Sequence, residues 1–544
     1  MSKLLTKGFL FFVAFLSSQS YAQWSTDPSN NLIVGYGLNP ELCSDGTGGS
    51  YITYEQNLTY PRQLLLERLN RYGYKPWGSS RHIVGELPEQ WFAKITEDGR
   101  GGVLIAYQDD SVGQFSVKSR IQVQRVDSSR NFLWGTNGVR VSLSENSQGD
   151  QAIVSDGRGG CIVTWIDTLG DLWINRIDSV GNRSWGDGGV FVAMQVQQPI
   201  KIIPDGSNGV FITWITPTSY VYKMQRVLYS GYLAWDPTAI NIPLGATTLV
   251  YGSQGNAILS GFDGNINNII YGSQKVDSLG IFQWQQPYLA VAESIQSIFV
   301  GYPISVNEQG YAVFAWPWRN MAGQWDLSSQ IVRSDGSTIF PFNGKPVSKI
   351  PSTKSIANVV ASDSGTSVFV WGDERTPSGV YTQRLDTFAK PLWDTTDVPI
   401  HFPLFSEMLV TTNCSNGIIV VGFHQFDFSI RALEASKYGK LGEVISSIND
   451  HIVSDLPQDF LLHQNYPNPF NSTTIIRYDI PKSSWIKIEV FNVLGQRIKT
   501  LVDILQNPGT YSVNFEGGDL PSGIYFYKLQ TTESIQVRKF TYLK

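Results

Sequence analysis

One stretch of the sequence, residues 317–326 (PWRNMAGQWD), gathers residue types that could bind a ligand. Trp318, Arg319 and Trp325 lie outside the tryptophan positions that recur along the chain. Exposed indole rings beside a guanidinium are typical of contact surfaces, and an indole could also stack on a sugar ring. We therefore predict a ligand-binding loop at these three residues. The alternative is an aromatic loop that folds onto its own strands.

The residue types needed for catalysis do not form catalytic patterns. The five histidines are scattered without metal-ligand spacing, and no Gly-x-Ser-x-Gly elbow occurs. Asp109 and Asp110 could act as a hydrolytic pair, but adjacent residues of a strand point to opposite faces. Residues 263–268 begin like a calcium loop and lack its later ligands. The sequence predicts no catalytic residue, no metal site and no cofactor, and favours a protein that is not an enzyme.

A unit that recurs along the chain must position any such site. In residues 155–186 an Asp-Gly turn precedes an apolar run ending in Trp, a loop, a second run ending near Arg and Asp, and a turn leading to Trp. Clear Asp-Gly turns begin at Asp45, Asp98, Asp156 and Asp205, and decayed copies follow. Eight copies fit between residues 40 and 445.

Each copy has the composition of β-strands. The runs are short, rich in Val, Ile, Tyr and Trp, and bounded by turn residues, and Asp-Gly supplies the positive φ angles of tight hairpins. Shorter runs before the turn and after the last Trp complete four strands per copy. Four-stranded sheets repeated in this way build a β-propeller. We predict an all-β chain with eight four-stranded blades over residues 23–447, and seven blades are the alternative.

Residues that recur in most copies are expected to build the ring, because a ring needs the same packing in every sheet whereas a site needs asymmetry. The tryptophans and the arginines of the second run are therefore predicted to be structural. The arginines are Arg125, Arg176, Arg226 and Arg384, and we expect buried ion pairs with Asp109, Asp167 or Asp373.

The first 22 residues have the order of a secretory signal peptide. Lys3 and Lys7 precede a short apolar run, and small residues follow it. Cleavage is expected between Ala22 and Gln23. No later run approaches the ~20 apolar residues of a membrane helix. We therefore expect an exported protein without a transmembrane segment.

The two ends of the repeat region are expected to meet. Residues 23–34 look like the end of a copy, with Trp24 placed like Trp134, and the eighth copy has no Trp of its own. We predict that this segment supplies the outer strand of the last blade and removes an open edge; an unpaired leader is the alternative. Cys43 and Cys414 hold equivalent positions in the first and eighth copies, and a disulfide or two separate buried residues both remain open.

The charge of the chain argues against nucleic acid as a partner. The formal net charge is −5, only 16% of residues are charged, and no basic cluster occurs. A nucleic-acid binder needs a basic patch or stripe.

The repeat gives way to a second, smaller region. Residues 448–458 are mostly polar and include Pro457, which indicates a linker. Residues 459–544 contain short runs joined by turns with Pro, Gly and Ser, which predicts a small immunoglobulin-like β-sandwich. The expected strands are 473–480, 485–491, 497–501, 509–515, 523–530 and 535–543.

Sequence motifs in this region follow one another in a familiar order. They are NYPNPFN at 465–471, VFNVLGQRIKTL at 490–501, LPSGIYFYKL at 520–529 and VRKF at 537–540. The region resembles the C-terminal sorting domain of type IX secretion cargo, with Ser472 where Pro is commoner. The motif residues carried over are Asn465, Tyr466, Pro467, Asn468, Pro469, Phe470, Gly495, Gly523, Tyr525 and Lys539.

This resemblance implies a route and partners. The signal peptide would direct export across the inner membrane, and the type IX translocon would carry the chain across the outer membrane. A sortase-like protease would cleave before Asn465, and the cargo would be released or attached to surface lipopolysaccharide. The expected location is outside the cell or on its outer surface. The propeller copies are also similar to repeats common in secreted proteins with this tail.

Two functions fit the sequence. We favour a non-catalytic binding or adhesion module for glycan or protein, and the alternative is a propeller hydrolase or lyase acting on polysaccharide. Three or more acidic, His or Tyr side chains converging at the central mouth would favour the enzyme. A flat or aromatic face would favour binding, since the fold itself does not decide.

Overall fold

The computed structural model divides the chain into two compact units, residues 1–443 (unit 1) and 444–544 (unit 2). The described residues form strands and turns without an α-helix, and none of them belongs to a helix able to cross a membrane. The described residues are 24–56, 62–78, 84–85, 89–110, 118–217, 221–235, 239–265, 268–295, 303–307, 309–319, 323–362, 365–413, 417–436, 438–441, 460–465, 467–480, 484–506, 509–518, 520–531 and 534–543.

Unit 1 is a series of antiparallel sheets that follow the repeat. The first sheet contains β2 (Leu38–Ser44), β3 (Ser50–Gln56) and β4 (Gln63–Leu69). The second contains β5 (Gln90–Glu97), β6 (Val103–Asp109), β7 (Arg120–Val126) and β8 (Val139–Arg140). The third contains β9 (Gln148–Ser155), β10 (Cys161–Asp167), β11 (Leu172–Ile177) and β12 (Val190–Ala193). The fourth contains β13 (Gln197–Pro204), β14 (Val210–Ile215), β15 (Tyr222–Val227) and β16 (Ile240–Ile242).

The second half of unit 1 repeats this plan. The fifth sheet contains β17 (Gly245–Ser253), β18 (Asn256–Asn265), β19 (Asn268–Val276) and β20 (Leu289–Ile295). The sixth contains β21 (Ile304–Val306), β22 (Ala312–Arg319), β23 (Trp325–Val332) and β24 (Lys345–Pro346). The seventh contains β25 (Lys354–Ala361), β26 (Ser367–Asp373), β27 (Gly379–Leu385) and β28 (Val398–His401). The eighth contains β29 (Glu407–Thr412), β30 (Ile418–His424), β31 (Ser429–Ala435) and β1 (Leu32–Tyr36).

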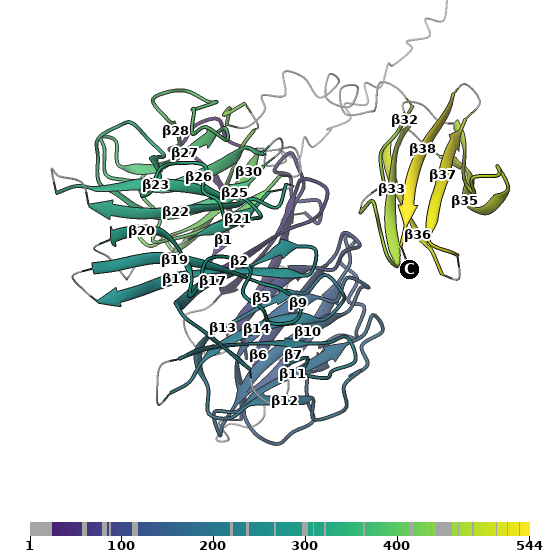
Figure 1. Ribbon diagram of the computed structural model, residues 1–544, viewed down its shortest axis with the longest axis horizontal. Helices are drawn as coiled ribbons and strands as arrows, with labels where there is room; N and C mark the ends of the chain where they lie inside the picture. Colours follow the sequence, from purple (N-terminus) through teal and green to yellow (C-terminus); the bar gives the residue numbers. More distant parts are fainter. Residues whose placement is uncertain are drawn as a thin grey trace, which may run out of the picture. The chain divides into compact units, whose positions relative to one another are not determined.

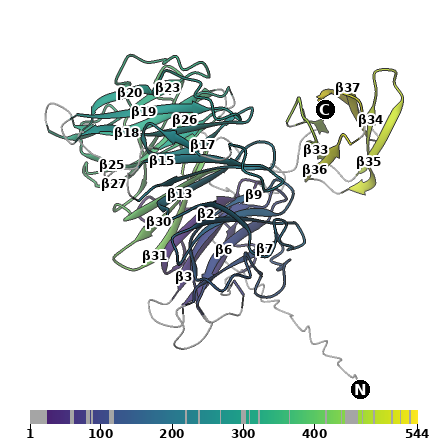
Figure 2. The same cartoon turned by 60° about the horizontal axis from the view of Figure 1, so that its bottom comes forward.

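The first strands of successive sheets pack against one another around the unit. Figure 1 shows strands β2, β5, β17, β21 and β25 gathered toward the middle of unit 1, and Figure 2 gives a second view of the neighbouring sheets. The order continues from sheet to sheet until β29 of the eighth sheet packs against β2 of the first. The sheets of unit 1 therefore form a closed cycle, which we call the ring.

The Asp-Gly turns fold because the Asp side chain binds the backbone of its own hairpin. Oδ1 of Asp156 accepts hydrogen bonds from the N–H groups of Arg158 and Gly160, at 2.8 Å each. Gly157 takes a φ of +71°, a region that glycine enters without steric cost. The same bonds form at Asp45, Asp98 and Asp205.

The ring arginines pair with the turn aspartates, so the expected pairing with Asp109, Asp167 or Asp373 is wrong. Arg176 lies opposite Ile162 at the start of β10, whereas Asp167 lies at the far end of that strand. Nε and Nη2 of Arg176 reach Oδ2 of Asp156, at 2.9 and 2.7 Å. Equivalent pairs join Arg125 to Asp98 and Arg226 to Asp205, whereas Arg384 donates to Thr366 Oγ1 and Asp373 pairs with Arg375.

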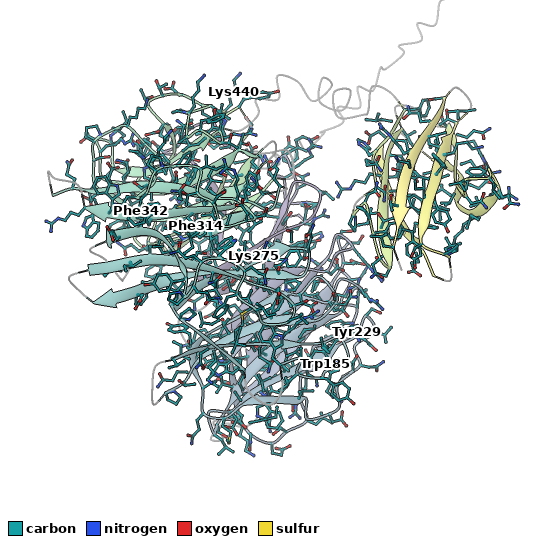
Figure 3. The ribbon with its side chains drawn as sticks, viewed as in Figure 1. Trp185, Tyr229, Lys275, Phe314, Phe342 and Lys440 are labelled. Carbon is teal, nitrogen blue, oxygen red and sulfur yellow. The ribbon has the colours of Figure 1, made fainter. Side chains whose placement is uncertain are left out.

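Neighbouring sheets are joined through their tryptophans. Trp185 Nε1 donates to the carbonyl oxygen of Tyr229 in the next sheet at 3.0 Å, and the guanidinium of Arg176 lies 4.3 Å from the centre of the Tyr229 ring. Figure 3 labels Trp185 and Tyr229, which lie close together. The bond from a tryptophan to a turn carbonyl of the next sheet recurs at Trp77, Trp134, Trp235 and Trp284.

The N-terminal segment joins the two ends of the repeat. β1 pairs antiparallel with β31, and Trp24 Nε1 donates to Arg71 O of the first sheet at 2.8 Å. Gly73 has a φ of +78°, and a Cβ there would lie 2.8 Å from Trp24. This contact repeats the one that ring tryptophans make elsewhere. Cys43 and Cys161 are free thiols, and Cys414 lies outside the described residues.

Unit 2 contains two antiparallel sheets around one core. One has β32 (Leu461–Leu462), β33 (Thr473–Ile480) and β36 (Gly509–Glu516); the other has the order β35 (Arg497–Gln506), β34 (Ser484–Phe491), β37 (Gly523–Gln530), β38 (Ile535–Tyr542). Phe470, Phe515 and Phe540 pack in the core. The strands expected at 473–480 and 523–530 are confirmed to the residue, and the one expected at 497–501 extends to 506.

Candidate functional site

One end of each ring sheet carries the segments that vary between copies. At the start of β5, Gln90 pairs with Asp109 at the end of β6, and Lys354 likewise pairs with Asp373. The start of each first strand therefore lies beside the loop between the second and third strands. We call this end of the ring the loop face; the Asp-Gly turns lie at the other end.

Trp318, Arg319 and Trp325 lie at the loop face, on two strands of a hairpin. β22 runs to Arg319 and β23 begins at Trp325, and these two residues are direct cross-strand partners. Because directly opposed residues share a face and successive residues alternate, Trp318 lies on the other face of the hairpin. It packs against the core between the fifth and sixth sheets. The structure thus brings together two of the three residues.

Phe92 is an exposed aromatic residue with a positive φ at the loop face, a combination that Phe428, in the turn between β30 and β31, shares. Phe92 has a φ of +47° and exposes 47% of its surface. A bulky residue with positive φ is an outlier, and such strain persists only where surrounding groups fix it. The N–H of Phe92 donates to Glu55 Oε1 at 2.7 Å, and its carbonyl oxygen accepts a hydrogen bond from Gln151 Nε2. Side chains from the first and third sheets therefore hold the backbone of Phe92.

The phenyl ring belongs to a three-layer stack. Its centroid lies 4.6 Å from that of Trp91, with 16° between the ring planes. The guanidinium of Arg62 lies 4.4 Å from the Trp91 centroid. We call Arg62, Trp91 and Phe92 the Phe92 cluster. Consecutive strand residues normally point apart, so the positive φ of Phe92 accompanies the stacking of the two rings.

Two neighbouring first strands have a strained polar residue at the same position. Asn39 in β2 and Asp150 in β9 lie, like Phe92, six residues before the turn Asp, with φ of +51° and +55°. Both are exposed, and register irregularities interrupt the strand pairing beside each of them. Such bulges redirect side chains near binding and active sites. The loop face therefore presents an amide, a phenyl ring and a carboxylate from three successive sheets.

Charged side chains lie two residues further along β2 and β5 than Asn39 and Phe92, and at the seam, where β29 of the eighth sheet meets β2 of the first. Glu41 and Lys94 form an ion pair between β2 and β5. Burial raises the pKa of Glu41, although Lys94 opposes the rise. Burial and the charge of Glu41 raise the pKa of Glu407. Burial of its amine and the charge of Lys94 lower the pKa of Lys201, although part of the Lys201 side chain is exposed. This level of the ring thus combines two carboxylates with two amines.

Sequence analysis missed the Phe92 cluster. The available signal was the pair Trp91-Phe92 within a first strand, which breaks the pattern of the other copies. The stacking of Trp91 and Phe92 depends on a backbone angle that Glu55 and Gln151 hold from other sheets. Such contacts between distant residues cannot be predicted from the local sequence. Among the described residues, no group of three or more His, Cys, Asp or Glu side chains could hold a metal ion.

In unit 2 the first sorting motif is bound to the last strand. Asn468 Oδ1 accepts from the N–H of Thr541 at 2.9 Å, and the N–H of Phe470 donates to the carbonyl oxygen of Thr541 at 3.1 Å. Asn465 is buried and its Nδ2 donates to Thr474 Oγ1 at 2.9 Å and to Pro467 O at 3.1 Å. The motif therefore caps the free edge of β38.

The other motif residues have varied settings. Tyr525 is buried against Phe540 and its hydroxyl donates to Pro521 O at 2.8 Å. Gly495 closes an exposed turn with a φ of +75°, Gly523 begins β37, and the Lys539 side chain is exposed. Asn468 and Pro469 are joined by a cis peptide bond. The expected cleavage site at Ala22 and Gln23, and Tyr466, lie outside the described residues.

Several solved structures resemble this chain remotely. A putative exo-β-1,3-galactanase from Bifidobacterium bifidum is 11% identical, covers 48% of this chain and 98% of its own, and has a TM-score of 0.26. A protein of unknown function from Desulfotomaculum acetoxidans is 14% identical over 72% and 95%, with a TM-score of 0.28. One from Dyadobacter fermentans is 11% identical over 78% and 96%, with a TM-score of 0.29. Scores this low support no inference about fold or activity.

The sequence matches no curated protein. The C-terminal region does match a family model, which is described as the secretion system C-terminal sorting domain and covers residues 464–542. The match includes the motif that caps β38 and every strand of unit 2 except β32. The chain therefore carries a sorting domain for the type IX secretion machinery, and it is a type IX cargo that is secreted or attached to the cell surface.

Proposed function

We propose that the ring is an eight-bladed β-propeller closed by β1, and that unit 2 is an immunoglobulin-like sandwich. The cycle from β2 to β29 and the pairing of β1 with β31 support this assignment. On this proposal residues 1–22 are a signal peptide, residues 23–447 the propeller, 448–458 a linker and 459–544 the sorting domain. The change between compact units at residues 443 and 444 lies close to the proposed linker.

We propose that this propeller is a non-catalytic module that binds glycan at its loop face. The observation that supports the proposal is Phe92, an exposed ring held at a strained φ by side chains of two other sheets. Strain of this kind clusters at ligand sites. An aromatic face is suited to the C–H face of a sugar, and Asn39 and Asp150 offer hydrogen-bonding groups for its hydroxyls.

The hairpin at Arg319 and Trp325 is proposed as a second contact for the same ligand. It lies at the loop face, and the two side chains share one face of the hairpin. Arg319 Nε donates to Gly323 O at 3.0 Å, which orients the guanidinium. Trp318 remains in the proposal only as the half-buried residue that packs against the core and supports this hairpin.

A hydrolase is the second candidate function, and one observation favours it. Glu41 and Glu407 come from the two strands that meet at the seam, and burial, with the charge of Glu41 adding to it and Lys94 opposing it, raises the pKa of Glu407. Glycoside hydrolysis generally uses two carboxyl groups, one of them with a raised pKa. Glu41 is already paired with Lys94, so only one of the two carboxylates is free to act as acid or base. The hydrolase is therefore the second candidate.

The test is a glycan and polysaccharide array probed with the mature chain, residues 23–544, with mass spectrometry of the same wells. We expect binding without cleavage, and we expect Phe92→Ala to remove it. Phe191→Ala is the matched control, because Phe191 is also exposed and packs against a Trp ring, on the outer strand β12. Cleavage products that disappear in Glu407→Gln would instead establish the hydrolase.

A further inference from the structure

The contacts of the first sorting motif give it a structural role within unit 2. Backbone and amide groups of Asn465, Asn468 and Phe470 are used in hydrogen bonds to β38 and to their own turn. The Phe470 ring lies in the core, 5.1 Å from Tyr542 and 5.4 Å from Phe540. Groups engaged in this way are not available to a partner while the domain is folded. The side chains of Pro467, Asn468 and Pro469 stay exposed, and a second surface of unit 2 is open to the export machinery as well.

The outward face of the four-stranded sheet has the composition of such a surface. Register places Lys528 opposite Val537 and Gln530 opposite Ile535, so these side chains share one face. Ile535 exposes 64% of its surface and Val537 exposes 55%. Exposed apolar residues scattered singly need no explanation, but adjacent ones on one face of a sheet form a patch typical of interaction sites.

Positive charge surrounds these apolar residues. Glu489 lies in the middle of the sheet and is almost fully buried, and its carboxylate contacts Lys487, Lys528 and Arg497, at 3.4, 3.3 and 3.1 Å. Lys528 also lies 5.1 Å from the centre of the Phe491 ring. These contacts fix the cations in place and leave the face with more positive than negative groups. Lys539 adds an exposed amine directly opposite Phe526.

We propose that the outward face of β34, β37 and β38, centred on Lys528, Ile535, Val537 and Lys539, docks onto an acidic and partly apolar protein surface of the type IX translocon. A protein fits better than a lipid surface, because ion pairs with Glu489 hold two of the lysines and an arginine in a fixed pattern on the sheet. Fixed charges give specificity through a complementary fixed pattern. An anionic membrane would require only mobile, protruding cations. This inference is independent of what the propeller binds.

The test is export of the full chain in a bacterium with a type IX translocon. The double variant Val537→Glu with Lys539→Glu reverses the charge of the face and leaves the backbone bonds of the motif intact. We expect at least tenfold less exported protein and periplasmic accumulation. The matched control is Ile475→Glu with Arg477→Glu, two exposed residues on β33 of the other sheet, which should export normally. Equal export of the two double variants would overturn the proposal.

Two further measurements separate folding and lipid binding from recognition. The midpoint temperature of thermal unfolding should be the same for the two double variants as purified full chains. It should be lower for Asn465→Ala, and any loss of export in that variant would then be explained by its lower stability. Binding of the full chain to vesicles with and without anionic lipid tests whether the positive face binds a membrane instead of a protein. Binding to anionic vesicles that is lost only in Val537→Glu with Lys539→Glu would assign the face to lipid and contradict a protein partner.

Discussion

At the scale of single residues, the ring depends on side chains that satisfy buried groups. Asp156 is almost completely buried, yet Oδ1 accepts two backbone N–H groups and Oδ2 accepts two from Arg176. A buried carboxylate is tolerated only with such partners. The pair recurs because each sheet needs the same turn, which is why it marks architecture and not a ligand site.

Arg176→Ala should therefore destabilise the ring strongly. Loss of the guanidinium leaves the Asp156 carboxylate buried without its cation, and breaking a buried pair in this way costs about 3–5 kcal/mol. Arg158→Ala, in the same turn but exposed, should cost no more than about 1 kcal/mol, because it loses only the contact of its guanidinium with the Tyr229 ring at 4.9 Å. Urea unfolding of both variants measures the difference. Similar values would show that the ion pair does not stabilise the turn.

His401 should make the seam sensitive to acid. It is fully buried, its Nδ1 is bonded to Asn31 Oδ1, and it stacks on Phe405 at 3.8 Å. Burial, with the charges of Arg431 and His424 adding to it and Asp427 opposing it, lowers its pKa to about 3. The unfolded chain binds this proton below about pH 6.5, so stability is lost as pH falls from 6.5 toward 3.

Between pH 7 and 5 the loss should amount to about 2 kcal/mol. The measurement is urea unfolding at both pH values for the native chain, for His401→Gln and for His463→Gln, whose histidine lies in unit 2. Only His401→Gln should show a shallower pH dependence. A steep dependence that persists in His401→Gln would place the acid sensitivity elsewhere.

At the scale of elements, β1 is the strand on which closure depends. Val34 is 2% exposed and packs in the core between the eighth and first sheets, whereas its neighbour Ile33 is 38% exposed. Val34→Asp buries an unpaired carboxylate and should cost several kcal/mol or displace the strand, while Ile33→Asp should be nearly neutral. A displaced β1 exposes the edge of β31, which favours association between chains. Denaturant midpoints and light scattering of the two variants test this; equal behaviour would show that β1 does not seal the ring.

Most strands could be predicted from the sequence because their signals are local. The Asp-Gly turns, the runs ending in Trp and the placement of Trp24 follow from repetition and turn chemistry, and β1 pairs where the missing outer strand required it. The ion-pair partner of Arg176 could not be predicted from the nearness of Asp167 in the sequence, because the register between β10 and β11 determines which carboxylate Arg176 reaches. The strain at Phe92 and the two faces of the Trp318 hairpin also depend on pairings between distant residues.

At the scale of the whole molecule, the two units divide the work of a secreted protein. Unit 2 has its own core and carries the type IX sorting domain. The ring repeats its packing around a closed cycle and departs from that repetition at the loop face, where Phe92 and its neighbours lie. A ligand site is expected where the sheets differ from one another, because the residues that recur in every sheet already bind one another.

The most direct test of this account is the dissociation constant of the best-bound array glycan for the mature chain and for three variants. We predict that Phe92→Ala weakens binding at least fivefold, that Phe92→Tyr preserves it because the ring remains, and that Phe191→Ala has no effect. Stacking of a nucleobase on an aromatic side chain is worth about 1–3 kcal/mol, and a similar contribution from a sugar ring corresponds to roughly five- to 150-fold in affinity. Unchanged affinity in Phe92→Ala would contradict the proposed glycan site at the loop face.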